Sequence, residues 1–250
     1  MSALVTRGLT RAFGGFVAVD KVDFTLEPGA RHALIGPNGA GKTTFVNLLS
    51  GALPATRGTV ALFGEDITTL PQHRRVRRGL ARTFQVNQLF PDFTPEEALT
   101  FAVAERQGLG ATWFRLVSRM AAPRDEAARL LDNLHFPDAD RRRPTSELPY
   151  GRQRLLEIAL ALAMKPRVLL LDEPAAGVPP ADSREVMAAI AALPEDVAVL
   201  LIEHDMDLVF RFARRITVLA FGAVLAEGAP DAIARDPRVR EAYLGEPAHG

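Results

Sequence analysis

The sequence predicts an α/β fold with a mainly parallel sheet, a small N-terminal antiparallel β subdomain and an inserted helical subdomain. Three observations predict it. In the C-terminal half, short apolar strands alternate with helical stretches, which is typical of a parallel sheet covered on both faces. A glycine-rich turn near residue 40 separates an apolar strand from a helix. Residues 94–134 change to the i, i+3, i+4 apolar spacing of helices.

The elements can be assigned in order along the chain. Turns at Gly14-Gly15 and Pro28-Gly29 separate short apolar runs, so we expect a small sheet that leads into a buried strand ending at Ile35. The next expected elements are a helix from Lys42 to about Leu49, a strand at Gly58–Phe63, a short basic helix at Pro71–Arg78, a helix at Gly151–Met164, a strand at Val168–Leu171, a helix at Ala181–Ala192, strands at Val197–Ile202, Ile216–Ala220 and Ala223–Ala226, and helices at Pro230–Ala234 and Pro237–Tyr243.

These elements fit a single domain over residues 1–250. We expect its core to consist of residues 1–85 and 155–250, with the helical subdomain inserted at about 86–154.

Composition excludes several classes of function. Thirty basic and thirty acidic residues cancel to zero net charge, so the whole chain has no electrostatic preference for nucleic acid. Without cysteine, disulfides, thiolate metal sites and a cysteine nucleophile are excluded. The longest apolar runs, Ile158–Met164 and Val197–Ile202, are too short to cross a bilayer. We therefore expect a soluble chain whose membrane role, if any, comes through a partner, and we interpret the basic clusters His73–Arg78 and Arg141–Arg143 as a solvated helix face and a linker.

The glycine-rich turn has the pattern of a phosphate-binding loop. The run Gly36-Pro37-Asn38-Gly39-Ala40-Gly41-Lys42-Thr43-Thr44 fits Gly-x4-Gly-Lys-[Ser/Thr] between a strand and a helix. Its glycines let successive N–H groups point at the β-phosphate, and the helix N-terminus adds partial positive charge. Lys42 would place a point charge on the β- and γ-phosphates, and Thr43 would offer a hydroxyl to Mg²⁺.

Acidic side chains follow two of the expected strands. Asp172 and Glu173 come directly after an apolar strand, and ligands collect at the C-terminal strand ends of an open parallel sheet. Asp172 is therefore placed to hold Mg²⁺ through water, and Glu173 to polarise the attacking water as general base. His204 follows the neighbouring strand and would sit at the γ-phosphate edge, while Gln85 is a further candidate ligand for metal and water.

Together these motifs resemble the ATP-binding subunits of ABC transporters over essentially the whole chain. The order is characteristic: aromatic Phe13, the phosphate loop, Gln85, a helical insert, the segment Leu148–Arg154, then Asp172-Glu173 and His204. The resemblance implies ATP hydrolysis with Mg²⁺ and places Phe13 on adenine and Gln85 in contact with the membrane subunit. It also implies a signature loop that covers the nucleotide of a second subunit in a head-to-tail pair. That loop comprises Pro149, Tyr150, Gly151, Arg152 and Gln153.

Finer features are similar to subunits for branched-chain amino-acid uptake. They are the runs 81–85, 150–159 and 241–246 and the segment Asp172–Gly177. The resemblance then implies permease subunits, a solute-binding protein in the assembled system, and a peripheral position on the cytoplasmic face of the inner membrane, with docking near Gln85 and Val86–Phe90. Two alternatives stay open: the motor of a lipid or polysaccharide exporter, and a soluble ABC ATPase acting on nucleic acid. The second usually has tandem ATPase domains or a long coiled-coil insert, and neither is present.

The sequence departs from the family pattern at three positions. Pro149 replaces the usual serine, Arg152 the common glutamine, and Pro179 an aspartate or asparagine. Proline offers neither hydroxyl nor N–H to a phosphate, although Arg152 could compensate as a cation. The resemblance implies that all three positions lie in elements that act on the partner's nucleotide. We therefore expect a non-identical second ATPase subunit and two unequal sites.

Overall fold

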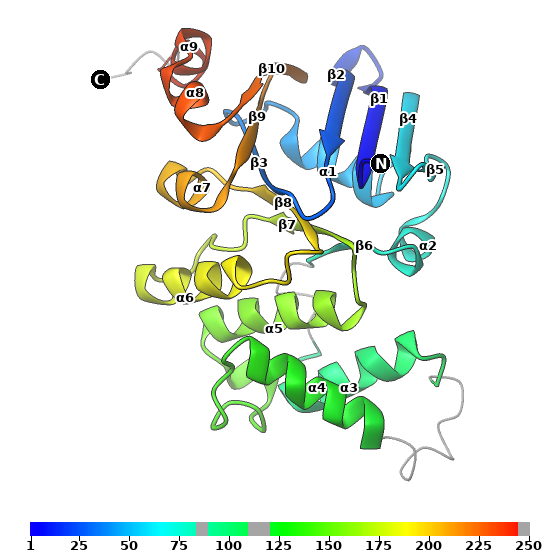
Figure 1. The fold of residues 1–250 in the computed structure, drawn as a ribbon, viewed down its shortest axis with the longest axis vertical. Helices are drawn as coiled ribbons and strands as arrows, with labels where there is room; N and C mark the ends of the chain where they lie inside the picture. The colour runs from blue at the N-terminus through cyan, green and yellow to red at the C-terminus, as the bar shows by residue number, and fades with distance from the viewer. Residues whose placement is uncertain (84–89, 110–120, 245–250) are drawn as a thin grey trace. The chain divides into compact units, whose positions relative to one another are not determined.

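The computed structural model describes residues 1–83, 90–109 and 121–244 (Figure 1). Its internal contacts divide the chain into two compact units. The first unit contains Met1–Arg82, Arg167–Glu173 and Pro194–Gly250, and the second contains Thr83–Pro166 and Pro174–Leu193. This grouping differs from the expected boundaries mainly in residues 155–166 and 174–193, which were expected in the core and belong to the second unit.

A six-stranded sheet forms the centre of the first unit, and its strand order is β10-β9-β3-β8-β7-β6. All neighbouring strands are parallel except β9 and β10, which pair antiparallel. The predicted mainly parallel sheet is thereby confirmed. The strands are β3 (Arg31–Ile35), β6 (Leu80–Arg82), β7 (Val168–Asp172), β8 (Ala198–Ile202), β9 (Arg215–Ala220) and β10 (Ala223–Gly228).

The predicted antiparallel sheet is also present, with the order β2-β1-β4-β5. It contains β1 (Leu4–Phe13), β2 (Phe16–Leu26), β4 (Arg57–Leu62) and β5 (Glu65–Asp66). The sequence analysis did not assign β1. The reason is a bulge: buried positions change phase between Thr6 and Leu9, where Gly8 has φ 54° and the pairing register shifts. This phase change hides the alternation that identifies a half-buried strand.

The central sheet separates two apolar clusters. Leu34 belongs to the cluster that joins both sheets to α1 (Lys42–Ser50) through Phe45. Its neighbours Ala33 and Ile35 belong to the other cluster, together with the C-terminal helices, because successive strand residues point to opposite faces. Those helices are α7 (Met206–Phe212), α8 (Pro230–Arg235) and α9 (Pro237–Leu244). The sequence analysis missed α7, a short helix whose first amides are capped by the Asp205 carboxylate.

One arginine of the first basic cluster is structural, so the expected solvated face is wrong for Arg75. This residue of α2 (Gln72–Arg77) is 2% exposed. Its guanidinium donates to the carbonyls of Leu48 and Leu49, both at 2.7 Å, and to those of Thr68 and Leu70. Burial lowers the pKa of Arg75 to about 10. The arginine therefore joins two carbonyls in the last turn of α1, of which Leu48 also accepts from the Gly51 amide at 3.3 Å, to the loop before α2.

Helices make up most of the second unit that the structure describes, and the helix at 180–191 and most of the helix at 150–163 were expected in the core. The helices are α3 (Pro95–Arg106), α4 (Ala121–Asn133), α5 (Tyr150–Ala163) and α6 (Pro180–Ala191). Thr94 and Glu97 form a capping box at the start of α3. Arg106, the last residue of α3, donates hydrogen bonds to two neighbouring helices. Its Nη2 lies 2.7 Å from the Glu126 carboxylate of α4, and its Nη1 lies 2.6 Å from the Ala163 carbonyl of α5. Hydrogen bonding to Arg106 lowers the pKa of Glu126 to about 2.

No helix within the three described stretches combines the length and the apolar character needed to cross a membrane.

The turn between β3 and α1 is shaped by close backbone contacts. Gly41 has φ 95°, and a Cβ placed on it would lie 2.3 Å from the Ala18 carbonyl oxygen. Gly39 also has a positive φ, of 77°, but a Cβ there would meet no atom within 4 Å. The Gly222 amide fixes the same turn from β9–β10 by donating to the Ala40 carbonyl at 3.1 Å. Only glycine fits at position 41 for reasons of space as well as of backbone conformation.

This contrast predicts unequal effects of two alanine substitutions. Gly39→Ala should lower the free energy of unfolding by about 1–2 kcal/mol, the strain of a left-handed alanine. Gly41→Ala should cost about 1–3 kcal/mol more, because its methyl group overlaps a backbone carbonyl that cannot rotate away. Urea denaturation of both variants beside the unsubstituted chain measures the difference. Equal losses would contradict the close approach of Ala18.

Candidate nucleotide-binding site

Lys42 opens α1 directly after the glycine-rich turn. Its Nζ donates to the Gly36 carbonyl at 2.6 Å and to the Pro37 carbonyl at 3.0 Å, so the side chain folds back over the loop. Burial lowers the pKa of Lys42, while the negative charges of Glu173 and Asp172 oppose that shift. No side chain caps the N-terminus of α1 at Gly41, and its first turn contains no acidic residue. The positive end of the helix dipole thus remains available to an anion.

The two predicted carboxylates lie at the C-terminal end of β7, in the first unit. Asp172 is the last residue of the strand, and its side chain is 18% exposed. Glu173 follows with φ 48°, a left-handed backbone conformation, and its amide donates to the Ile202 carbonyl at 2.9 Å. Its side chain is 46% exposed. Glu173 is therefore held by its backbone while its carboxylate faces solvent, where a water molecule can reach it.

His204 follows β8, the neighbouring strand. Its Nδ1 lies 3.9 Å from Glu173 Oε1 and 3.8 Å from Oε2 of the buried Glu203. The structure thus brings His204 beside Glu173. The predicted group of Lys42, Asp172, Glu173 and His204 gathers at one edge of the sheet.

Sequence reasoning assigned no role to Arg82, yet this residue contacts the site directly. It ends β6, and its Nη2 lies 2.6 Å from Asp172 Oδ2, while Nη1 donates to Asn47 Oδ1 of α1 at 2.5 Å. The only sequence feature that pointed to Arg82 was its place in the run 81–85, which the sequence analysis used for the resemblance to a subfamily and not for a role in the site.

The donors available to a metal are hard oxygen atoms. Thr43 offers an exposed hydroxyl on α1, and Asp172 offers the carboxylate oxygen that Arg82 does not use. Within residues 1–83, 90–109 and 121–244 no cluster of three His, Cys, Asp or Glu side chains is arranged for a metal ion. A few protein oxygens completed by phosphate and water are what Mg²⁺ prefers, so the residues present fit Mg²⁺.

The remaining loop residues and the predicted adenine contact lie in the first unit. Asn38 and Gly39 are exposed and Ala40 is buried, while Thr44 is half-buried. Phe13 ends β1 with 45% of its surface exposed, and the Arg11 guanidinium lies 4.5 Å from its ring centroid. Gln85, together with most of the segment proposed for permease docking, lies outside the described residues.

The signature loop belongs to the second unit and begins α5. Pro149 occupies the N-cap position and provides no side-chain cap. Arg152 forms ion pairs with Glu185 at 2.5 Å and with Asp140 at 3.7 Å. The cation that could compensate for the missing serine is thus balanced by two carboxylates. Gln153 donates to the Leu148 carbonyl, the Tyr150 hydroxyl lies 2.8 Å from an Arg154 nitrogen, and Gly151 packs against Asp182 of α6.

A buried carboxyl group lies further along α5. The side chain of Glu157 is 3% exposed and pairs with Arg154 at 3.0 Å. Burial raises the pKa of Glu157 to about 7, although Arg154 opposes the shift. Its proton therefore titrates near neutral pH.

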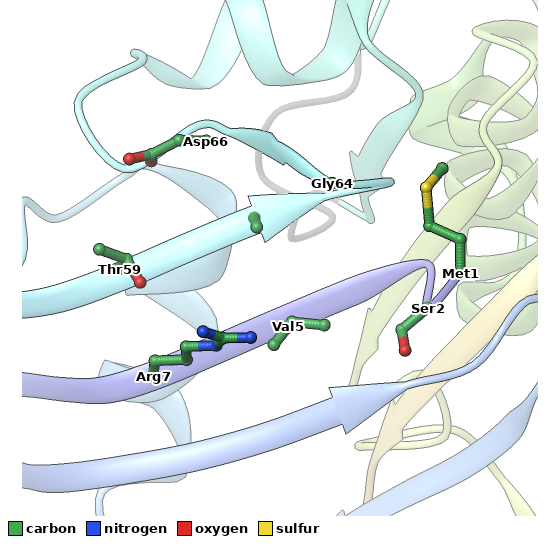
Figure 2. A pocket seen from close by; sticks show the side chains of 8 residues that line it. Met1, Ser2, Val5, Arg7, Thr59, Gly64 and Asp66 are labelled. Carbon is green, nitrogen blue, oxygen red and sulfur yellow. The ribbon is translucent and has the colours of Figure 1, made fainter.

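A shallow hollow of about 330 Å³ lies on the antiparallel sheet (Figure 2). None of the residues expected to bind nucleotide contributes to it. It is lined by Met1, Ser2, Val5, Arg7, Thr59, Ala61, Gly64 and Asp66.

Comparison with known proteins finds two matching families. The family described as "ABC transporter" matches residues 19–176, and "Branched-chain amino acid ATP-binding cassette transporter" matches residues 223–249. The chain is 42% identical to the high-affinity branched-chain amino acid transport ATP-binding protein BraF of Pseudomonas aeruginosa, covering 97% of this chain and 98% of that protein. It is 40% identical to LivG of Escherichia coli K12, a protein with the same description, over the same shares of the two chains.

Solved structures agree with this relationship. A nucleotide-free ATP-binding cassette from an ABC transporter superposes with a TM-score of 0.86 at 28% identity and covers 98% of this chain and 100% of its own. The ADP conformation of the cassette MJ1267 superposes with the same TM-score at 29% identity. The phosphate loop, the two acidic strand ends and these matches lead to one conclusion: the chain belongs to the ABC transporter family, among its ATP-binding subunits.

Proposed function

We propose that this chain hydrolyses Mg²⁺-bound ATP to power uptake of branched-chain or similar amino acids through a membrane permease. The observation that carries the proposal is the meeting of Lys42 with Asp172 and Glu173 beside an uncapped helix N-terminus. This is the charge arrangement that phosphoryl transfer requires, since the reaction depends on positioning and on electrostatic stabilisation.

Each residue of the site has a separate task in this scheme. The loop amides and Lys42 bind the β- and γ-phosphates, and Lys42 leaves the Gly36 and Pro37 carbonyls to do so. Thr43, Asp172 and Gln85 would hold Mg²⁺, which supplies charge neutralisation on the phosphate oxygens. Phe13 stacks on adenine.

Hydrolysis itself falls to the exposed carboxylate. Glu173 orients a water molecule and accepts its proton, while His204, 3.9 Å from Glu173, contacts the γ-phosphate edge. Glu173 and His204 thereby lie side by side at the γ-phosphate edge.

The relatives support a proposal for the solute and the partners. Both curated relatives are named for branched-chain amino acid transport, and the C-terminal family match is to the same class. This favours the importer over the lipid exporter and over the nucleic-acid ATPase. We therefore propose permease subunits and a solute-binding protein as partners, with the chain peripheral on the cytoplasmic face of the membrane.

The second ATPase subunit is proposed to differ from this chain. Pro149 has no hydroxyl to offer to a γ-phosphate, and the charge of Arg152 is balanced by Glu185 and Asp140. The site that this signature loop completes should therefore turn over slowly. The site at this chain's own phosphate loop depends on the partner's signature loop instead.

The first test is the ATPase activity of the purified chain, alone and with its co-encoded ATPase partner. Activity should appear with the partner and fall at least about 100-fold in Lys42→Ala and Glu173→Gln, which remove the phosphate cation and the general base. Arg74→Met, on the exposed face of α2, serves as the control. Strong ATPase activity of the chain alone would contradict the proposed pairing with a different ATPase subunit. Unchanged activity in Glu173→Gln would contradict the assignment of Glu173 as general base.

A second test addresses the unequal sites. The double variant Pro149→Ser/Arg152→Gln restores the usual signature residues and should raise turnover of the assembled transporter severalfold, because a hydroxyl donor to the γ-phosphate returns. Steady-state ATPase assays of the complex measure it, with Arg142→Gln on the exposed linker as the matched control. An unchanged ATPase rate in the double variant would contradict the proposal that the two sites are unequal.

A further inference from the structure

Arg82 links the three elements that surround the metal-binding carboxylate. It ends β6, pairs through Nη2 with Asp172 at the end of β7, and pairs through Nη1 with Asn47 of α1. The helix α1 also carries Lys42 and Thr43. One planar guanidinium therefore ties the phosphate-loop helix to the strand that presents Asp172, and lysine could not replace its two-pronged geometry.

The pair is shielded from solvent. The side chains of Arg82 and Asp172 are 17% and 18% exposed. Salt screens such a pair far less than a surface pair, so the attraction persists at physiological ionic strength. Charge-assisted hydrogen bonds of this kind are also stronger than neutral ones.

The contact uses one side of the carboxylate only. Oδ2 accepts from Arg82, while Oδ1 accepts no hydrogen bond from any residue that the structure describes. A carboxylate held by one oxygen cannot rotate freely, and its other oxygen keeps a fixed direction. Partners that orient a metal-binding carboxylate in this way tune metal affinity without touching the metal.

We propose that Arg82 is a positioning residue that holds Asp172 through Oδ2 and leaves Oδ1 to Mg²⁺ or its bound water. Asn47 in turn orients Arg82. The inference rests on the proposed Mg²⁺-dependent function, and it adds a task for two residues that touch neither nucleotide nor metal. The opposite arrangement, in which Arg82 competes with the metal for Asp172, predicts an effect of opposite sign.

The test measures binding of a fluorescent ATP analogue to the purified chain over a Mg²⁺ titration and in excess EDTA. Arg82→Met should raise the Mg²⁺ concentration for the half-maximal change about 10–100-fold. Affinity in EDTA should stay within about threefold, because the contacts at Gly41 and Gly222 hold the phosphate loop without Arg82. Asn47→Ala should shift the Mg²⁺ requirement in the same direction by a smaller factor. Arg78→Met, which removes the exposed Arg78–Glu65 pair, should behave as the unsubstituted chain.

The outcomes separate the inference from the proposed function. If Mg²⁺ does not change the nucleotide affinity of the unsubstituted chain, the assignment of Asp172 and Thr43 to Mg²⁺ is contradicted, and the inference fails with it. A Mg²⁺-dependent chain with an unchanged or lowered requirement in Arg82→Met would contradict the inference alone. If Arg82→Met does not fold, Arg82→Lys decides, because lysine keeps a cation but cannot hold Asp172 and Asn47 together. An unchanged Mg²⁺ requirement in Arg82→Lys would overturn the proposal.

Discussion

The turn from β3 into α1 constrains the rest of the first unit. Its backbone passes so close to the Ala18 carbonyl that a side chain at position 41 has no room, and the β9–β10 turn fixes it from another direction through Gly222. Because the turn is held at these points, α1 begins at a fixed place, with its uncapped N-terminus and Lys42 at the C-terminal edge of the central sheet. The positions of the site's positive charges follow from that geometry.

The negative charges have a separate origin, in the parallel strands. Asp172 ends β7, Glu173 follows it, and His204 follows β8. The positive and the negative charges of the site meet because the turn and the strand ends share one edge of the sheet. Arg82 and Arg75 add contacts that hold the set together, one to Asp172 and one to the C-terminal carbonyls of α1. The C-terminal half of α1 is therefore held by two arginines, Arg82 at Asn47 and Arg75 at Leu48 and Leu49.

Local signals made much of this predictable. The pattern around Lys42 is confined to a short run of residues, and the two carboxylates directly follow an apolar strand, so sequence alone reveals each of them. The bulge at Gly8 concealed β1 because it changes the phase of alternation. Arg75 and Arg82 were missed for another reason. Their partners are 27 and 90 residues away in the chain, and an arginine in a basic run or before Thr83 shows no sign of such contacts until the fold is known.

The proposed mechanism requires above all that the turn and Lys42 bind the β-phosphate of the nucleotide. The most direct measurement compares the affinities of the purified chain for ATP, ADP and AMP by isothermal titration calorimetry. Because each lost charge-assisted contact is worth about 1.5–3 kcal/mol, AMP should bind at least about tenfold more weakly than ADP or ATP. Replacement of Lys42 by alanine should narrow that gap. Equal affinity for all three nucleotides would contradict the account, since adenine and ribose would then supply the binding energy without the loop.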